Sequence, residues 1–308
     1  MIPLKKEFLR GSYPPLVTPF KGNGEVDFES FRTCVDFSIR HESHGVVISG
    51  TSAEPSTLTL EERIQLFKEA IDVSAGRVPV VAATGSQSER ETVILTEAAE
   101  QAGADALLIV TPYYVRPPQR GLAQYYINVC ARTALPVMIY HIPARTAVSI
   151  QLDTLKEIVE KADNVVGMKH AVNDLGFVTR MLATFGWEWR VFAGLEDLSF
   201  PMLAIGACGV MNAIGNLAPK KLAQMCEAVE RGELAAARKL HYELAELNEA
   251  IFYDTNPIPI KYMMWKMGLI AKNHHRLPMA PATSELGERL DGVMKRAGLE
   301  AVNWIAAA

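Results

Sequence analysis

The chain has 308 residues, of which 49% are hydrophobic and 21% charged, and its formal net charge is −4. This length suffices for one barrel-sized domain or two ordinary ones, and a mildly acidic chain without a dense Lys/Arg run gives no sign of a nucleic-acid partner. No apolar run approaches the roughly 20 residues of a membrane span, and the N-terminus has no apolar signal core. The 4 cysteines form no Cys-x-x-Cys pair, so we expect free thiols in a cytoplasmic protein.

Short apolar runs that recur along the first two-thirds of the chain have the composition of buried strands. Most lack polar alternation, which is typical of parallel strands covered on both faces. Amphipathic helical segments separate the runs, and two of these segments begin with the capping-box patterns Thr59-x-x-Glu62 and Ser88-x-x-Glu91. The repeat of one strand and one helix predicts an α/β fold, a (β/α)8 TIM barrel. The predicted strands are residues 13–20, 45–49, 78–84, 106–110, 136–140, 164–169, 190–194 and 209–215.

A doubly wound open sheet is the alternative fold for such a pattern. It would place a Gly-rich phosphate-binding turn after the first strand, but residues 17–27 read VTPFKGNGEVD and lack the G-x-G-x-x-G spacing. The last part of the chain is predicted to be helical only, over residues 219–232, 233–252, 256–269 and 283–297. We therefore predict a barrel over residues 1–230 and a C-terminal helical region over residues 231–308, packed on the barrel and not independent.

Polar side chains gather where the predicted strands end, at the face where barrels of this kind carry their active sites. The second strand is followed by GTSAE (50–54), the fourth by TPYY (111–114), and the fifth ends in YHIPART (140–146). The sixth strand, NVVGMKH (164–170), contains Lys169 near its end. A buried ammonium group costs several kcal/mol unless it is paired or loses its proton. A lysine in this run therefore indicates a functional group.

These residue types can carry out a specific chemistry. A lysine removed from water supplies a neutral amine, which adds to a ketone and forms a Schiff base. The reaction needs proton transfer, for which we predict Tyr140 as carrier and the Thr51 hydroxyl as relay. The backbone N–H groups of the turn from Gly50 to Ser52 suit a small carboxylate, and Arg145 suits another. The set predicts a site for a 2-oxo acid and a second anionic substrate.

The chain resembles the dihydrodipicolinate synthase / N-acetylneuraminate lyase superfamily of lysine-dependent pyruvate aldolases, from PPLVTPF to NPIPIK and the final RLPM. The resemblance implies that Lys169 forms the Schiff base and that Tyr140 is the general acid/base. It also implies that Thr51 belongs to the proton relay and Ser52 to pyruvate binding. It implies that Arg145 is a distal carboxylate clamp and that Tyr114 is a relay tyrosine that reaches across from a neighbouring subunit. It also implies that the backbone carbonyl of Met211 touches pyruvate.

The arginine of YHIPART resembles that of the dihydrodipicolinate synthases, whose second substrate carries a carboxylate. The resemblance thus implies condensation of pyruvate with L-aspartate 4-semialdehyde to 4-hydroxy-tetrahydrodipicolinate, in lysine and diaminopimelate biosynthesis. It further implies a homotetramer that needs no metal or other cofactor and has no nucleic-acid or membrane partner. Within the superfamily, a 2-keto-3-deoxy sugar-acid aldolase or dehydratase is the alternative.

Some positions depart from the family pattern. Ala53, His141 and His170 stand where a glycine, an asparagine and an acidic residue are usual. In some relatives a lysine-feedback site uses histidines in the helix after the GTSAE loop. Leu60 and Arg63 occupy that region here, so we do not expect strong inhibition by lysine.

Other interpretations of the same residues are a structural role, a metal site and a non-catalytic binding protein for a keto acid. In the structural one, Lys169 pairs with a barrel carboxylate such as that of Glu54. In the metal site, His141 and His170 act with a nearby carboxylate, that of Glu54, Glu196 or Asp197. Side chains alternate along a strand, so both histidines point away from the barrel if Lys169 points into it. We interpret Tyr113 as aromatic packing and expect five histidines to be solvated, His41, His44, His241, His274 and His275.

Overall fold

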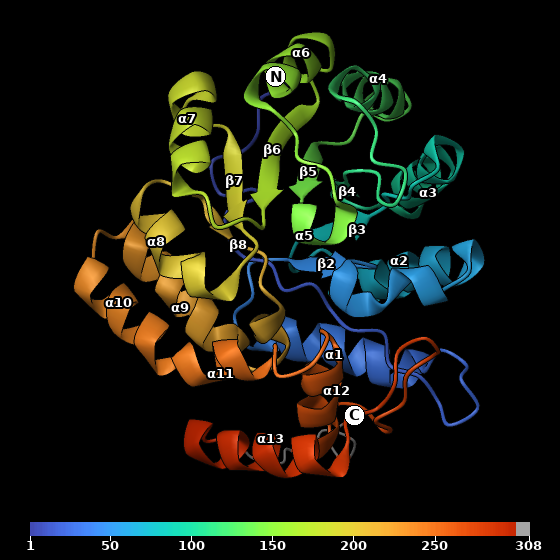
Figure 1. The fold of residues 1–308 in the computed structure, drawn as a ribbon, viewed down its shortest axis with the longest axis vertical. Helices are drawn as coiled ribbons and strands as arrows, with labels where there is room; N and C mark the ends of the chain where they lie inside the picture. The colour runs from blue at the N-terminus through green and yellow to red at the C-terminus, as the bar shows by residue number, and fades with distance from the viewer. Residues whose placement is uncertain (300–308) are drawn as a thin grey trace.

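The computed structural model describes residues 1–299 as a single parallel sheet surrounded by helices (Figure 1). The strand order is β1-β8-β7-β6-β5-β4-β3-β2. A bridge between Pro15, after β1, and Val47 of β2 closes the sheet into a ring. The predicted (β/α)8 barrel is therefore confirmed. The strands are β1 (Gly11–Ser12), β2 (Val46–Ile48), β3 (Val80–Ala83), β4 (Ala106–Val110), β5 (Val137–His141), β6 (Val165–His170), β7 (Arg190–Ala193) and β8 (Gly209–Val210).

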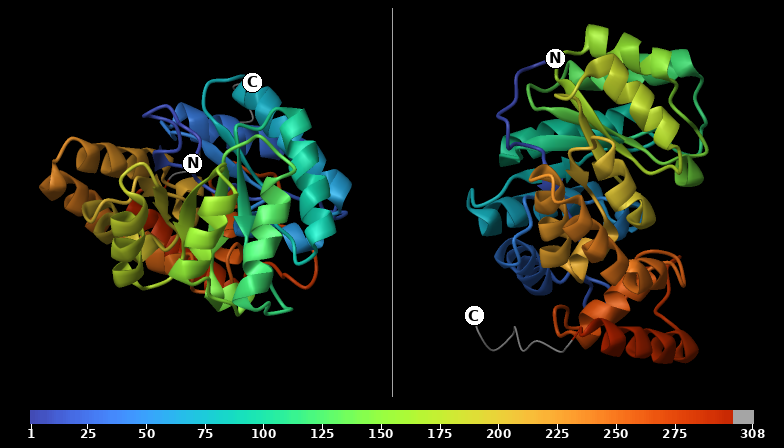
Figure 2. Two further views of the ribbon diagram at one scale, coloured as in Figure 1. Left: turned by 90° about the horizontal axis from the view of Figure 1, so that it is seen from above. Right: turned by 90° about the vertical axis from the view of Figure 1, so that its left-hand side faces the viewer.

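Helices alternate with the strands and pack on the outside of the ring, as the two further views in Figure 2 show. Among residues 1–299, no helix is long and apolar enough to cross a bilayer. The helices are α1 (Phe28–Arg40), α2 (Leu60–Ser74), α3 (Glu89–Ala102), α4 (Gln119–Cys130), α5 (Pro143–Thr146), α6 (Leu152–Lys161), α7 (Leu175–Phe185), α8 (Ser199–Ala204), α9 (Pro219–Glu230), α10 (Leu234–Glu243), α11 (Ala245–Ala250), α12 (Ile258–Lys266) and α13 (Ser284–Ala297).

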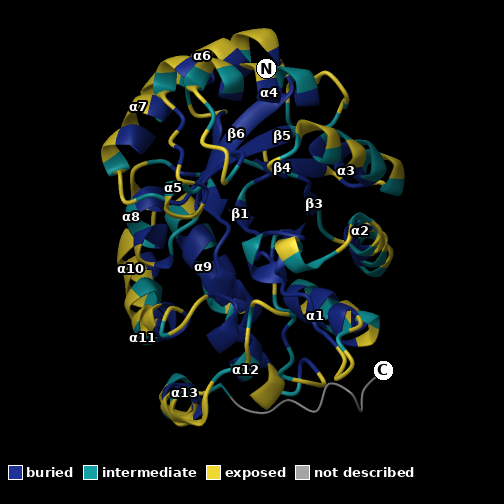
Figure 3. Cartoon of the chain, turned by 45° about the vertical axis from the view of Figure 1, so that its right-hand side comes forward, coloured by how far each residue is buried: buried dark blue, intermediate teal, exposed yellow. Residues whose placement is uncertain are grey.

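The strands are buried on both faces, as Figure 3 shows, and the exposed residues lie on the outer faces of the helices. Alternate side chains enter two separate apolar clusters. In β2, Val47 belongs to the cluster inside the ring, whereas Val46 and Ile48 belong to the cluster between the strands and the helices. The barrel interior is thus a packed core and not an open channel.

The N-terminal segment covers the amino end of the ring. Leu9 is fully buried in the inner cluster, and Ile2, Leu4 and Phe8 pack against it. The guanidinium of Arg190, at the start of β7, donates to the carbonyls of Phe8 (3.1 Å) and Lys5 (3.2 Å). This segment closes the end of the barrel opposite to the βα loops.

The predicted first strand is wrong in its position. β1 is short and precedes residues 13–20, which contain prolines that have no N–H to donate to a ladder. These residues instead cross from β8 to β2. The N–H of Tyr13 donates to the carbonyl of Val210 and that of Leu16 to the carbonyl of Val47, each at 2.9 Å.

The predicted eighth strand, residues 209–215, is too long. β8 ends at Val210, and a 3₁₀ turn follows from Ala213 to Asn216. Side chains form the hydrogen bonds that a neighbouring strand would otherwise provide. Glu196 accepts from the N–H of Ala213 (2.8 Å), and Asn216 donates to the Ala213 carbonyl (2.9 Å). Local side-chain hydrogen bonds have replaced the ladder.

The predicted capping residues begin their helices. Thr59 and Glu62 form the full capping box of α2. Ser88 caps α3, but its partner Glu91 accepts a hydrogen bond from the hydroxyl of Ser86 (2.6 Å).

The C-terminal part is helical, and α13 packs against α11 and α12. The helix predicted over residues 233–252 is divided at Leu244 into α10 and α11. The predicted boundary after residue 230 stays a prediction. Residues 300–308 of the predicted region lie outside the described residues.

Candidate active site

Tyr140 and Lys169 are neighbours on adjacent strands. They are register partners in β5 and β6, and their exposed fractions are 5% and 3%. Lys169 Nζ lies 4.3 Å from the centroid of the Tyr140 ring, and Tyr140 Oη lies 3.3 Å from Thr51 Oγ1. The structure thus places an amine, a phenol and a hydroxyl next to one another, and their role as a proton relay stays a prediction.

An irregularity in β6 turns Lys169 into the barrel. Val166 belongs to the inner cluster, so strict alternation would also direct residue 168 inward and residue 169 outward. The register shifts between Val137 and Met138, which pair with Val165 and Gly167, and Met168 belongs to the outer cluster. Such bulges re-aim side chains. Gly167 is required at this point, since a Cβ there would lie 2.1 Å from the Arg190 carbonyl oxygen.

The loop after β2 brings Gly50, Thr51 and Ser52 to the same place. Thr51–Ala53 form a 3₁₀ turn, and Gly50 precedes it in an extended conformation. Ser52 is 1% exposed, and its hydroxyl accepts a hydrogen bond from the side-chain amide of Asn256 (3.1 Å). Asn256 belongs to the NPIPIK motif, so the C-terminal region contributes to the wall of the site.

A cavity of about 240 Å³ opens at this end of the barrel. Arg145 lies on its wall, on α5. Tyr113, which we interpreted as aromatic packing, also lines the cavity. Arg63, whose pKa burial lowers to about 10, lines it as well and donates to the Ala83 carbonyl (2.7 Å). Other lining residues are Ser49, Gly50, Thr51, Glu54, Tyr140, Thr146, Asn256 and Met279.

Two of the predicted residues are placed differently from the rest. Tyr114 is 90% exposed and has a φ of 70°, so within this chain its side chain does not enter the cavity. Met211 is fully buried in the inner cluster, and its N–H donates to the Ala193 carbonyl (2.9 Å). Of the predicted set, the structure brings together Lys169, Tyr140, Thr51, Ser52, Gly50 and Arg145 around the mouth of the barrel.

Glu54 pairs with Lys261, so the structural interpretation of Lys169 as its partner is wrong. Lys261 Nζ donates to Glu54 Oε1 at 2.7 Å, and the side chains are 0% and 1% exposed. His275 Nδ1 lies 3.2 Å from the same oxygen. Burial opposes ionisation of Glu54, but His275 and Lys261 outweigh it and lower the pKa of the carboxyl group. The expectation that His275 is solvated is also wrong, since it is 5% exposed.

Glu196 is a second buried carboxyl group, close to the lysine of β6. Burial raises its pKa to about 7, against hydrogen bonds from backbone N–H groups and the positive charge of Lys169. It lies just after Gly194, where an added Cβ would stand 3.1 Å from Lys169 Cε. Glu196 is therefore a group that changes charge near neutral pH within the electrostatic reach of the amine.

His141 and His170 form a pair on the outer side of the ring, as alternation predicts. Their Nδ1 atoms are 3.3 Å apart, and His141 Nε2 accepts from the N–H of Ile150 (3.3 Å). Burial lowers the pKa of His141 to about 3 and that of His170 to about 4. Over residues 1–299 no group of three or more His, Cys, Asp or Glu side chains is arranged for a metal ion.

The chain matches the model of the dihydrodipicolinate synthetase family over residues 8–297. The chain belongs to this family. It is 44% identical to the 4-hydroxy-tetrahydrodipicolinate synthase of Thermus thermophilus over 292 residues, which are 94% of this chain and 97% of the relative. The synthase of Pseudomonas aeruginosa is 36% identical over 94% of this chain and 99% of its own length.

Solved structures of synthases from the family have the same fold. That of dihydrodipicolinate synthase from Aquifex aeolicus superposes with a TM-score of 0.93 at 34% identity, over 96% of this chain and 100% of the other. The chloride-inhibited synthase of Acinetobacter baumannii, solved in complex with pyruvate, gives a TM-score of 0.91 at 35% identity, over 94% of this chain and 99% of the other. The family membership and the barrel are thus established together.

Three residues at or next to the site were missed by sequence reasoning. Asn256 and Lys261 lie in NPIPIK, which was used only as a family motif, and His275 was expected in solvent. A buried charge on an otherwise apolar helix is the available signal, because IPIKYMM places Lys261 among hydrophobic residues.

Proposed function

We propose that this chain is a class I lyase that condenses pyruvate with L-aspartate 4-semialdehyde and forms 4-hydroxy-tetrahydrodipicolinate. The observation that carries the proposal is the line of three groups inside the mouth of the barrel, Lys169 Nζ over the Tyr140 ring and Tyr140 Oη beside Thr51 Oγ1. A protein that only binds a keto acid needs no proton relay. Family membership supports the same reaction.

The proposed reaction begins with attack of the Lys169 amine on the ketone carbon of pyruvate. Tyr140 gives a proton to the hydroxyl of the resulting carbinolamine, which leaves as water, and Thr51 passes protons to and from the phenol. Tyr140, left as a phenolate, then takes a methyl proton from the protonated Schiff base, which gives an enamine. The Ser52 hydroxyl and the N–H groups of the Gly50–Ser52 turn hold the pyruvate carboxylate. The protonated Schiff base on Lys169 is the electron sink, so we propose no metal or organic cofactor.

The second substrate enters through the cavity. The enamine carbon attacks its aldehyde carbon, whose oxygen takes a proton from Tyr140, and the imine forms again on Lys169. The amino group of the second substrate then attacks the imine carbon, which closes the ring and releases the Lys169 amine. Arg145, on the wall of the cavity, is suited to bind the carboxylate of aspartate semialdehyde in a bidentate manner. A 2-keto-3-deoxy sugar acid has neutral hydroxyl groups at the position where Arg145 would bind an anion, so this arginine favours aspartate semialdehyde.

We also propose that Tyr114 completes the relay in a neighbouring subunit of a homotetramer. Its exposure and its positive φ fit a side chain held outward for a partner. Mixing two inactive variants, Tyr114→Phe and Lys169→Arg, tests this. If the tyrosine acts across the interface, hybrid assemblies contain some sites with both groups and recover activity, whereas no recovery would contradict it. We place the protein in the cytoplasm, where its four free thiols stay reduced.

The decisive experiment is reduction with borohydride in the presence of pyruvate, followed by mass spectrometry of peptides. We expect the reduced adduct on Lys169, and none without pyruvate. A label on another lysine would refute the proposed chemistry.

The substrate assignment is tested with a panel of aldehydes, aspartate semialdehyde and sugar-derived aldehydes included, ranked by kcat/KM at saturating pyruvate. The assignment predicts that aspartate semialdehyde ranks first. A higher rank for a neutral sugar aldehyde would instead favour the aldolase of 2-keto-3-deoxy sugar acids.

A further inference from the structure

The C-terminal region holds the loop that carries Thr51 and Ser52. Asn256, just before α12, donates to Ser52 (3.1 Å), and Lys261, on α12, donates to Glu54 (2.7 Å). A third tie runs from Arg276 to the loop at residue 57. The ties therefore occur at three successive points of the loop, and all come from residues 256–276.

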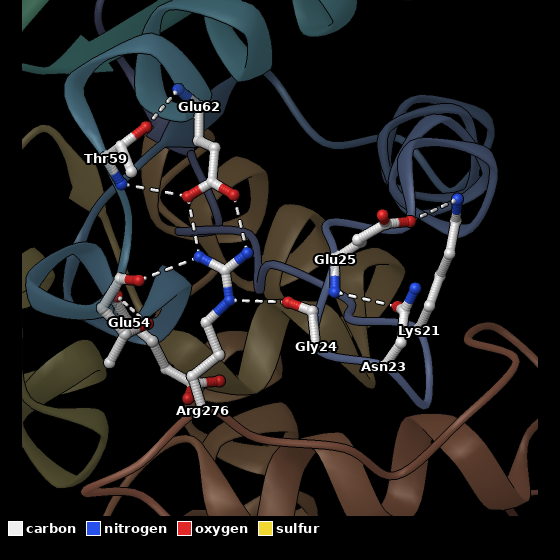
Figure 4. Close-up of polar contacts among 9 residues, drawn as sticks. Lys21, Asn23, Gly24, Glu25, Glu54, Thr59, Glu62 and Arg276 are labelled. Carbon is white, nitrogen blue, oxygen red and sulfur yellow. Dashed lines mark hydrogen bonds and ion pairs between the residues drawn. The ribbon is translucent and has the colours of Figure 1, made fainter.

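Arg276 extends this contact to the base of α2, as Figure 4 shows. Its guanidinium donates to the Thr57 carbonyl (2.9 Å) and to both carboxylate oxygens of Glu62 (2.6 and 2.7 Å). It also donates to the carbonyl of Gly24 (2.7 Å). Glu62 is part of the capping box of α2, so the same arginine joins the helix start to the end of the loop.

The loop depends on such ties because it has little regular structure of its own. Two 3₁₀ turns, Thr51–Ala53 and Pro55–Thr57, meet at Glu54, which has the left-handed conformation (φ 55°, ψ 47°). The backbone N–H groups of residues 53, 54, 57 and 58 all donate within the loop. Short 3₁₀ turns and a left-handed non-glycine residue persist only where the surroundings hold them.

We propose that Lys261 is a positioning residue for the pyruvate half of the active site: through its ion pair with Glu54 it sets the place of Thr51 and Ser52. This inference rests on the proposed function. Lys261 is not among the residues that line the cavity; it acts on the turn that binds the carboxylate and relays the proton. Arg145 comes from β5 and α5, outside this network, so the second substrate's clamp is independent of the pair.

The pair makes a discriminating experiment possible. Lys261→Met leaves the carboxylate of Glu54 buried without its cation, so we expect this variant to lose both stability and activity. The double variant Glu54→Gln/Lys261→Met removes both charges at nearly constant volume and regains stability. The tie to the loop is still weakened, and a displacement of about 1 Å at a reacting group lowers the rate by up to about 100-fold.

We therefore expect the double variant to unfold at the wild-type temperature while its kcat/KM for pyruvate stays at least about tenfold lower. Its KM for aspartate semialdehyde should equal that of the wild type. The control is Lys266→Met, on the same helix, whose ammonium pairs with Asp291 at 3.0 Å on the surface; it should change neither constant.

The kinetic constants are measured at a temperature at which circular dichroism finds every variant folded. If kcat/KM for pyruvate in the double variant recovers together with stability, Lys261 has only a structural role and the inference is overturned. An equal loss for both substrates overturns it too. A wild-type protein that forms no borohydride-trapped pyruvate adduct refutes the proposed function instead, whatever the variants do.

Discussion

His170 offers a test of how the neutral histidine pair contributes to stability. The variant His170→Asn retains an oxygen acceptor near the position of Nδ1, where it can accept from His141, and it removes one titrating ring. In the folded protein, burial lowers the pKa of His170 to about 4, against a partly opposing effect of Asp174, whereas the unfolded value is 6.5. The unfolded chain therefore takes up a proton between pH 6.5 and 4 that the folded chain excludes.

The sign of the effect follows from this difference. Because the unfolded state binds more protons in this window, the free energy of unfolding falls as the pH drops from 6.5 to about 4. A difference of about 2.5 pKa units, at roughly 1.4 kcal/mol each, amounts to about 3.5 kcal/mol for this residue over the whole titration, of which about 3 kcal/mol is lost by pH 4. His141 adds a further loss of the same sign, since its pKa is lowered to about 3.

Urea unfolding at pH 7, 6, 5 and 4 measures the predicted slope. The wild type should lose about 3 kcal/mol more than His170→Asn between pH 7 and pH 4. Phe177→Leu is the matched control, because Phe177 stacks on His170 (ring centroids 5.4 Å apart) and carries no charge. The decrease in the free energy of unfolding that Phe177→Leu causes should be the same at every pH. Parallel curves for the wild type and His170→Asn would refute the reasoning.

Three further predictions concern the barrel mouth. Lys169→Arg should abolish the borohydride-trapped pyruvate adduct, because a guanidinium forms no Schiff base. The control is Lys161→Arg, on the surface of α6. An adduct retained in Lys169→Arg would contradict the mechanism. Arg145→Ala should keep the adduct and lose condensation; condensation at the wild-type rate would reject aspartate semialdehyde as substrate. Burial raises the pKa of Glu196 from 4.5 to about 7 in the folded protein, so the wild type loses stability as the pH rises through that window. Glu196→Gln does not titrate, so its stability relative to the wild type should be about 3 kcal/mol higher at pH 8 than at pH 4.5. Equal differences in melting temperature from the wild type at both pH values would count against this prediction.

Much of the barrel could be predicted from the sequence because each strand is a short, uniformly apolar run. The runs at 106–110 and 190–194 lie within a residue of β4 and β7. The first and eighth strands could not be delimited in this way, because prolines without an N–H follow β1 and side chains bind the backbone groups that follow β8. Asn216 and Glu196 decide where β8 ends, and neither belongs to that strand.

The sequence predicts the part of the candidate site in which a residue type is rarely buried except for its chemistry. A lysine at the end of a buried run indicates an amine kept for reaction, and the structure places Lys169 beside Tyr140. The inward direction of that lysine was not predictable, because it depends on a bulge at Gly167 that simple alternation does not include. The buried pair of Glu54 and Lys261 could not be foreseen either, because its members are 207 residues apart in sequence.

The N-terminal segment covers the amino end of the ring, and the cavity at the barrel mouth opens at the other end. Tyr113 and Arg145 line this opening, through which we expect both substrates to enter. Lys169 is 3% exposed and is the register partner of Tyr140, which lines the cavity, so we expect the small keto acid to bind before the larger aldehyde. An aldehyde that binds before the keto acid blocks its access to Lys169. Excess aldehyde should therefore inhibit turnover, and the inhibition should be competitive with respect to pyruvate.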